Sequence, residues 1–211
     1  MSVSLPAEIQ EVITSLQLLS SLGKKSATKI TLDYILSTSE NQKAIVNSLQ
    51  KSLENIKFCP QCHYLSDGGL CVICKNTNRT QNIICLVEKV TDIISLENTE
   101  VYYGLYHVLN NLISPIDNKF EEDTTLIELV NQRLPKLCLK HEFVELILFF
   151  KQGFNAQTTT AFLTQSLNTQ PYRNQIKITQ MAQGLPVNYN PEKLDIATLT
   201  KALNARTDIN N

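Results

Sequence analysis

Apolar residues in the first 56 positions recur at the spacing of amphipathic helices. Between residues 5 and 19 they alternate at steps of four and three, at Leu5, Ile9, Val12, Leu16 and Leu19, which is the spacing of one helix face. A second helical pattern passes through Ile30 and Tyr34. A third pattern, over residues 41–56, predicts a helix with four inward-facing residues, Ile45, Leu49, Leu53 and Ile56.

After residue 80 the pattern changes to short apolar runs that alternate with helical spacing. Residues 83–87 form a continuous apolar run that ends at Glu88, which predicts a buried strand of a parallel sheet. We expect further strands at 101–109, 144–150 and 176–181, and helices at 90–96, 126–137, 158–167 and 196–206, with a bend or an end near Pro135. This alternation predicts an α/β domain. Ligands of parallel sheets bind at the carboxyl ends of strands, which is where Glu88 stands.

Two Cys-x-x-Cys pairs lie between these regions, and they are formed by Cys59 with Cys62 and by Cys71 with Cys74. Each pair directs two thiolates at one ion, and Asp67-Gly68-Gly69 supplies turn residues that return the chain. Four sulfurs leave no open coordination position, so we predict one structural Zn²⁺ per chain. Two disulfides or a thioredoxin-like redox pair fit the spacing poorly. We interpret His63 as a surface residue or a neighbour of the ligands, and Cys85 and Cys138 as small buried residues.

Composition adds limits to this picture. The chain has 211 residues, 43% of them apolar, and a formal net charge of -1, so any contact with DNA has to come from local basic patches. No apolar run approaches the ~18 residues that a membrane span requires. The N-terminal residues are spaced like a helix face and not like a signal peptide, and we expect a cytoplasmic protein without a membrane partner.

The turn between the first two predicted helices has the layout of a helix-hairpin-helix. Gly23 precedes Lys24 and Lys25, and Lys29 follows one turn later. In such a hairpin, backbone N–H groups at a helix start bind a DNA phosphate with the help of basic side chains. The usual hairpin has two glycines, and Ser21 replaces the first. The alternative is a surface turn with solvated lysines.

Several further motifs complete the pattern. They are the cysteine segment 59–74, Arg79, the run 84–88 with Asp92, the strand 103–109, Ile113-Ser114-Pro115-Ile116, Gly184-Leu185-Pro186-Val187, Thr198-Leu199 and Arg206. This order of parts resembles the RecR family of bacterial recombination mediators over nearly the whole chain. The resemblance implies an α+β, multi-part chain: a helical, helix-hairpin-helix-like region at 1–56, a four-cysteine zinc finger at 57–78, a Toprim domain at 79–174 and a C-terminal segment at 175–211.

The resemblance also implies function and partners. Members of the family form a homodimer or a ring-shaped tetramer that encircles or clamps gapped or double-stranded DNA without sequence preference, and they act with RecO and, where present, RecF. Lys25 matches the DNA-contacting lysine of the family, with Lys24 and Lys29 beside it. Glu88 and Asp92 match acidic residues implicated in holding RecO. Without a partner, Glu88 or Asp92 would simply cap or begin the next helix.

Departures from the family pattern keep alternatives open. The acidic pair that follows the third Toprim strand is replaced by neutral Asn155 and Gln157, which removes two negative charges. Asn110-Asn111 and Asn188-Tyr189 replace paired glycines, and Asn tolerates positive φ. Our leading hypothesis is a non-enzymatic DNA clamp in recombinational repair. The alternatives are a partner-binding module with weak or no DNA affinity and a metal-dependent Toprim enzyme, for which too few carboxylates are present.

Aromatic residues gather on the expected strand at 101–109, at Tyr102, Tyr103, Tyr106 and His107. Stacking on nucleic-acid bases is one interpretation. We prefer packing within the sheet, because strands are rich in aromatic residues for that reason.

Overall fold

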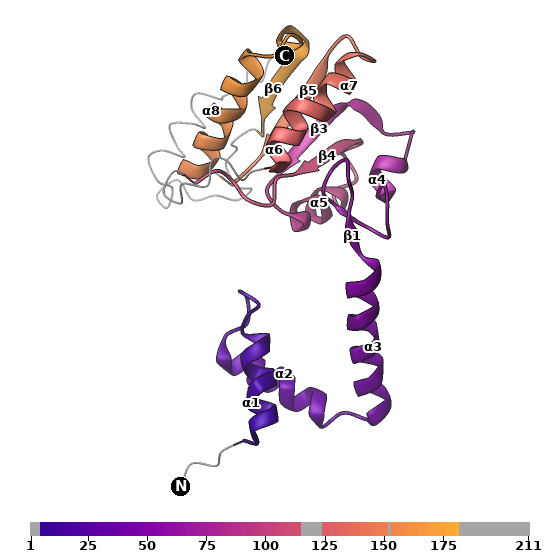
Figure 1. Cartoon of the computed structure of the whole chain (residues 1–211), viewed down its shortest axis with the longest axis vertical. Helices are drawn as coiled ribbons and strands as arrows, with labels where there is room; N and C mark the ends of the chain where they lie inside the picture. The colour runs from indigo at the N-terminus through magenta and orange to yellow at the C-terminus, as the bar shows by residue number, and fades with distance from the viewer. Residues whose placement is uncertain (1–4, 115–123, 152, 182–211) are drawn as a thin grey trace, which may run out of the picture. The chain divides into compact units, whose positions relative to one another are not determined.

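A computed structural model describes residues 5–114, 124–151 and 153–181. The chain divides into two compact units, residues 1–56 and 57–211 (Figure 1). The predicted helix at 196–206 lies outside the described residues, as do Pro115, Ile116, Asn188-Tyr189 and the motifs at 184–187, 198–199 and 206. Among the described residues, no helix is long and apolar enough to cross a membrane.

In its described residues, 5–56, the first unit consists of three helices, as the sequence predicts. They are α1 (Ala7–Leu16), α2 (Lys24–Ile35) and α3 (Ser39–Asn55). α1 packs against α2, and this contact buries Ile13, Ala27 and Thr31. The side chain of Thr38 accepts a hydrogen bond from the Asn41 amide at 3.3 Å, which satisfies one of the free N–H groups at the start of α3.

The apolar stripe of α3 does not face inward, which corrects the prediction from its spacing. Leu49 is 62% exposed and Leu53 is 80% exposed, and Ile45 and Ile56 are exposed as well. α3 has no buried residue along its 17 positions. The spacing identified an amphipathic helix correctly, but residues 5–56 supply no second layer against which this face could pack.

The second unit begins with a small finger. Strands β1 (Lys57–Phe58) and β2 (Leu65–Ser66) pair antiparallel, and a short helix α4 (Val72–Lys75) follows. The finger is joined to the sheet by a backbone hydrogen bond of 2.9 Å from the Val108 amide to the Cys62 carbonyl.

A four-stranded sheet forms the centre of the second unit, and its strands are β3 (Thr80–Val87), β4 (Gly104–Val108), β5 (Val144–Phe149) and β6 (Ile176–Gln180). The strand order is β4-β3-β5-β6, and every pair is parallel. The predicted parallel α/β sheet is therefore confirmed. β6, which lies in the segment that the sequence analysis assigned to the C-terminal part, is the fourth strand of this sheet.

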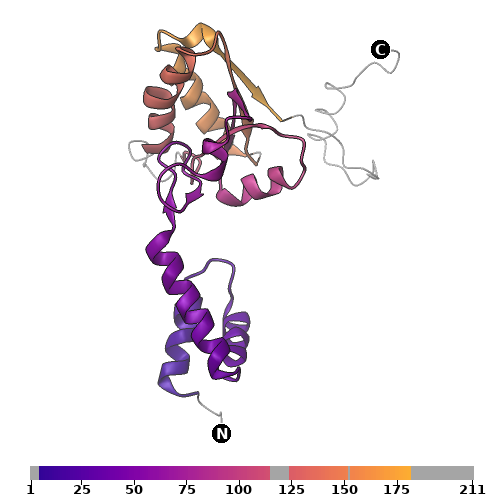
Figure 2. The same cartoon turned by 90° about the vertical axis from the view of Figure 1, so that its right-hand side faces the viewer.

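The helices of the second unit cover both faces of the sheet. They are α5 (Val90–Glu97), α6 (Thr124–Glu128), the π-helical turn η1 (Leu129–Arg133), α7 (Leu134–Cys138) and α8 (Phe154–Asn168), and a short 3-10 turn η2 (Arg173–Gln175) precedes β6. Figure 2 shows α5 on one side and the other helices on the opposite side. This arrangement follows from right-handed crossovers that run in opposite directions from β3. The segment expected to form one helix with a bend or an end near Pro135 consists of α6, the π turn and α7, and Pro135 lies in the first turn of α7.

The core lies between the sheet and these helices. The last four residues of β3, Ile84–Val87, are at most 2% exposed, as expected of a strand covered on both faces. Tyr106 and His107 are buried, which confirms the packing interpretation for them, whereas Tyr103 is 65% exposed. Asn110, which follows β4, has φ of 64°, in agreement with the expectation that Asn serves a left-handed position here.

Candidate functional site

The four paired cysteines converge on one point in the finger. Their Sγ atoms lie within 4.8 Å of one another, and Cys62 Sγ and Cys71 Sγ are 3.5 Å apart. Tetrahedral zinc with Zn–S bonds of about 2.3 Å places its sulfurs roughly 3.8 Å apart. Cys59, Cys62 and Cys71 are buried and Cys74 is half-buried. The geometry therefore fits a closed, four-sulfur zinc site.

Local backbone structure explains how so short a segment brings the sulfurs together. Gly68 and Gly69 have φ of 105° and 82°, conformations that side chains rarely adopt, and they turn the chain back after β2. The Cys71 amide donates to Cys59 Sγ, and the Cys74 amide donates to Cys71 Sγ, both at 3.4 Å. These N–H groups stabilise negative charge on the sulfurs.

The electrostatics of the sulfurs also fit a metal. Hydrogen bonds from Cys62 and then Cys74 lower the pKa of the Cys71 thiol to about 2, whereas the hydrogen bond with Cys71 raises the pKa of Cys62. Cys62 and Cys71 thus compete for negative charge when no cation is shared between them. A divalent cation removes this competition, because each thiolate then binds the ion directly. The predicted structural zinc, one per chain, is supported by the donor set itself.

His63 lies outside the group of four converging sulfurs. Its Nε2 lies 2.9 Å from a carboxylate oxygen of Glu128 on α6. Its ring packs edge-on against His107 of β4, with ring centroids 5.2 Å apart. His63 therefore connects the finger to the sheet and to the helix beside it.

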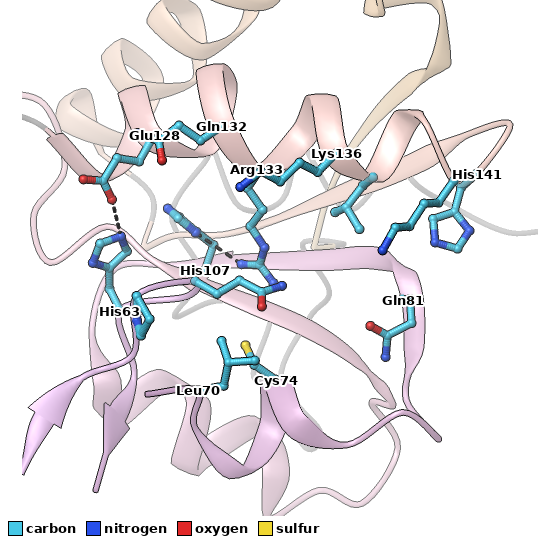
Figure 3. A pocket seen from close by; sticks show the side chains of 14 residues that line it. His63, Leu70, Cys74, Gln81, His107, Glu128, Gln132, Arg133, Lys136 and His141 are labelled. Atoms are coloured by element: carbon cyan, nitrogen blue, oxygen red, sulfur yellow. Dashed lines mark hydrogen bonds and ion pairs between the residues drawn. The ribbon is translucent and has the colours of Figure 1, made fainter. Parts of the chain in front are cut away.

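A cleft of about 660 Å³ lies where the finger meets the segment α6–η1–α7. Figure 3 shows finger residues on one side of it and helix residues on the other, with Arg133 pointing from the helix toward Cys74. Sequence reasoning missed Arg133. Its signal was present, because Arg133 stands seven residues after Leu126 and four before Leu137 and so falls on the apolar face of that helix.

The predicted DNA-contacting lysines lie at and near the start of α2. Lys24 and Lys25 are the first two residues of that helix, and both are exposed, as is Lys29. Gly23 occupies the N-cap position and makes no side-chain cap. The amides of the first turn thus lie beside three lysine side chains, at the positive end of the helix dipole.

The two predicted partner-contact acids follow β3 but differ in their surroundings. Asp92 accepts a hydrogen bond of 2.8 Å from the Lys89 amide, so its carboxylate caps α5. Glu88 has a side chain that is 28% exposed, and its Oε1 lies 3.9 Å from Lys89 Nζ. Of the two acids, Glu88 has its carboxylate less committed to the fold.

Glu88 follows the carboxyl end of β3, and the strand register places it at the same end of the sheet as Asn155 and Gln157. Val87 pairs with Phe149 in the adjacent strand, and β5 leads to α8, which carries exposed Asn155 and Gln157 in its first turn. The chain continues from β3 and from β5 into helices on opposite faces of the sheet. The carboxyl ends of these two strands therefore form the topological switch point of the sheet.

Other polar and sulfur groups in the second unit have structural roles. Burial raises the pKa of Cys85 to about 12, and burial also raises the pKa of Cys138, so neither thiol is activated as a nucleophile. Arg79 makes a two-pronged contact with Glu97, with nitrogen–oxygen distances of 2.9 and 2.7 Å. This pair fastens the beginning of β3 to the end of α5.

The finger and the four-stranded parallel sheet together define a class of protein: a four-cysteine zinc-finger chain with a Toprim-type domain. Family models agree with this assignment. The model of the RecR zinc finger domain with four cysteine ligands matches residues 56–76, and a Toprim domain matches residues 82–182.

Known relatives make the assignment more specific. The chain is 30% identical to a recombination protein RecR of Cytophaga hutchinsonii, over 94% of this chain and 93% of the relative. It is 35% identical to that of Francisella tularensis subsp. novicida, over 96% of each chain. It is 33% identical to that of Clostridium perfringens, over 97% of this chain and 98% of the relative. The chain therefore belongs to the RecR family of recombination proteins, as the motifs of its sequence indicated.

Proposed function

We propose that this chain is a non-enzymatic DNA-binding clamp of recombinational repair. The observation that carries the proposal is the start of α2, where amides without a side-chain cap lie beside exposed Lys24, Lys25 and Lys29. Backbone amides and lysines at a helix start bind phosphate without reading bases. Binding to gapped or double-stranded DNA should then be independent of sequence and sensitive to salt.

Removal of the lysines tests this proposal. Lys25→Ala together with Lys29→Ala should weaken binding to a gapped duplex at low salt by about 1 to 2 kcal/mol, or roughly 5- to 30-fold, because two phosphates are no longer neutralised. The matched control is Lys43→Ala with Lys51→Ala, which removes the same charge from exposed positions of α3. Equal affinity of the two double variants, measured by fluorescence anisotropy, would favour the alternative of a partner-binding module with little DNA affinity.

The uncovered stripe of α3 supports assembly with further copies of the same chain. Leu49 and Leu53 lie on an apolar face that stays exposed within the described part of its own unit, and contiguous exposed apolar surface typically marks an interface. A closed homodimer or tetramer would cover this face and would repeat the same lysines around a ring, so that a chain with net charge -1 presents several basic patches.

Solution mass tests the assembly. Leu49→Glu with Leu53→Glu should reduce the mass measured by multi-angle light scattering to that of a smaller species. Asn47→Glu with Lys51→Glu, on the opposite face of α3, should leave the mass unchanged. A wild-type chain that is monomeric at all concentrations contradicts the proposed use of this face.

We propose that a partner binds at the carboxyl end of β3, where Glu88 lies. Its partly exposed carboxylate is available to a basic surface of a RecO-type partner, and of RecF where that protein is present. Glu88→Gln keeps the shape and removes the charge, and we expect it to weaken RecO capture in a pull-down. Asp92→Ala should instead lower stability through loss of the hydrogen bond that caps the helix. Unchanged capture by the Glu88 variant contradicts the assignment.

We infer a non-catalytic role for the Toprim-type domain. Two-metal chemistry needs several carboxylates around the ions. Here Asp92 is engaged by the Lys89 amide, and Asn155 and Gln157 are neutral. Cleavage or primer synthesis that depends on Mg²⁺ and disappears in Glu88→Gln would overturn this inference.

A further inference from the structure

Arg133 is a buried cation at the contact between the finger and the helix that covers the sheet. It is the last residue of the π turn η1 and is 6% exposed. One terminal nitrogen, Nη1, donates to the Tyr106 carbonyl at 2.6 Å and to His107 Nδ1 at 3.2 Å. Its Nε and Nη2 have no hydrogen-bond partner among the described residues.

A buried guanidinium needs a source of negative charge nearby. Burial lowers the pKa of Arg133, and the charges that act in the opposite direction are those of the cysteine sulfurs, Cys74 first and then Cys62. Figure 3 shows the guanidinium directed toward the side of the cleft that carries Cys74. Zinc bound by four thiolates has a formal net charge of minus two. The cationic side chain and the anionic centre are thus buried side by side.

The neighbours of Arg133 hold it in this orientation. His107 Nε2 lies 2.8 Å from the Thr125 carbonyl, and because a carbonyl only accepts, Nε2 carries the proton. Nδ1 is therefore the acceptor for Arg133. Burial, followed by the charge of Arg133, lowers the pKa of His107 to about 3, so the imidazole stays neutral and adds no repulsion.

We propose that Arg133 is the counter-charge of the zinc centre, supplied by the sheet-covering helix to the finger. Metal binding then stabilises two things at once: the fold of the finger and the attachment of the finger to the segment α6–η1–α7. Arg133 is a positioning residue, because it acts on the metal through the thiolates and not as a ligand.

Zinc release tests this role directly. Zinc-loaded full-length protein is mixed with excess chelator, and the released ion is followed with a colorimetric zinc indicator. Arg133→Met should lower zinc affinity roughly 10- to 100-fold, as for other residues that support the ligands of a metal, with correspondingly faster release. Arg133→Lys keeps the positive charge but lacks the planar guanidinium, and its zinc affinity should lie between those of the wild type and of Arg133→Met. Lys136→Met removes an exposed cation from the next turn and should behave like the wild type.

Thermal melting with and without zinc separates charge compensation from packing. In zinc-loaded protein Arg133→Met should lower the melting temperature. In reduced, zinc-free protein the same change should lower the melting temperature less, because fewer of the sulfurs then carry the negative charge that Arg133 compensates. An equal loss in both forms, or wild-type release from Arg133→Met, overturns the proposal. If Arg133→Met does not fold, faster release from Arg133→Lys than from Lys136→Met supports the proposal, and equal release overturns it.

Discussion

The substitution Arg79→Met should destabilise the second unit by about 2–3 kcal/mol. Arg79 donates to both carboxylate oxygens of Glu97, to the Gly104 carbonyl at 2.8 Å and to the Tyr102 carbonyl at 3.2 Å. Tyr106 also donates to Glu97, at 2.5 Å. Methionine retains the aliphatic part of the side chain and removes all of the hydrogen bonds that Arg79 donates.

The magnitude follows from the exposure of the two partners. The side chain of Arg79 is 11% exposed and that of Glu97 is 35% exposed. Breaking a fully buried pair costs about 3–5 kcal/mol, and an exposed pair is worth about 0–1 kcal/mol, so this half-buried pair falls between. Burial opposes ionisation of Glu97, but the hydrogen bonds from Arg79 and Tyr106 outweigh it and lower its pKa. The contribution of the pair should therefore disappear as acid protonates Glu97 below the ordinary glutamate range.

Urea unfolding followed by tyrosine fluorescence measures the effect, because six of the seven tyrosines lie after Ile56. With a slope of about 2 kcal/mol per molar urea, the midpoint should fall by about 1–1.5 M. Lys75→Met is the control, because the Lys75–Asp67 pair is 3.8 Å apart with both side chains more than half exposed. If Arg79→Met and Lys75→Met both stay within about 0.5 kcal/mol of the wild type, the reasoning from burial is wrong.

Three further predictions concern residues of the second unit. A Cβ on Gly104 would meet the Ile83 carbonyl oxygen at 2.8 Å. Gly104→Ala should therefore lower the urea midpoint by the equivalent of about 1–3 kcal/mol. Gly153→Ala is the control and should change the midpoint little, because a Cβ there would meet no atom within 4 Å. Because the pKa of His107 is lowered to about 3, the unfolded chain takes up a proton first as pH falls below about 6.5. The free energy of unfolding should then decline by up to about 1.4 kcal/mol per pH unit. If the free energy of unfolding of His107→Gln falls as steeply as that of the wild type between pH 6.5 and 5.5, the prediction is wrong. Cys71→Ser should reduce bound zinc, measured by elemental analysis, well below one ion per chain, and full zinc content contradicts the four-sulfur site.

The sequence was most informative where one physical effect dominates. The continuous apolar run before Glu88 identified β3 because a parallel strand covered on both faces excludes polar residues. The spacing of Cys59, Cys62, Cys71 and Cys74 identified the metal site because two tight turns suffice to close a tetrahedron.

Two features depended on contacts that spacing does not encode. The stripe of Leu49 and Leu53 was assigned to the interior, but the described part of its own unit supplies no surface that covers it. Arg133 was overlooked because a charge on an apolar helix face has meaning only when the neighbouring chain segment is known. Here that neighbour is the finger, and its sulfurs lie far from the helix in sequence. The π turn that carries Arg133 has no simple sequence signal.

The salt dependence of DNA binding tests the central claim most directly. Zinc-loaded protein would be titrated with a gapped duplex at increasing potassium chloride concentration, in parallel with a variant in which Lys24, Lys25 and Lys29 are all glutamine. A clamp that grips phosphates through α2 predicts that the logarithm of the binding constant falls linearly with the logarithm of salt concentration. It also predicts a shallower slope for the variant, by about 0.9 for each phosphate that the variant no longer neutralises. An identical slope for both proteins, or no binding by a folded zinc-containing oligomer at any salt concentration, would contradict such a clamp.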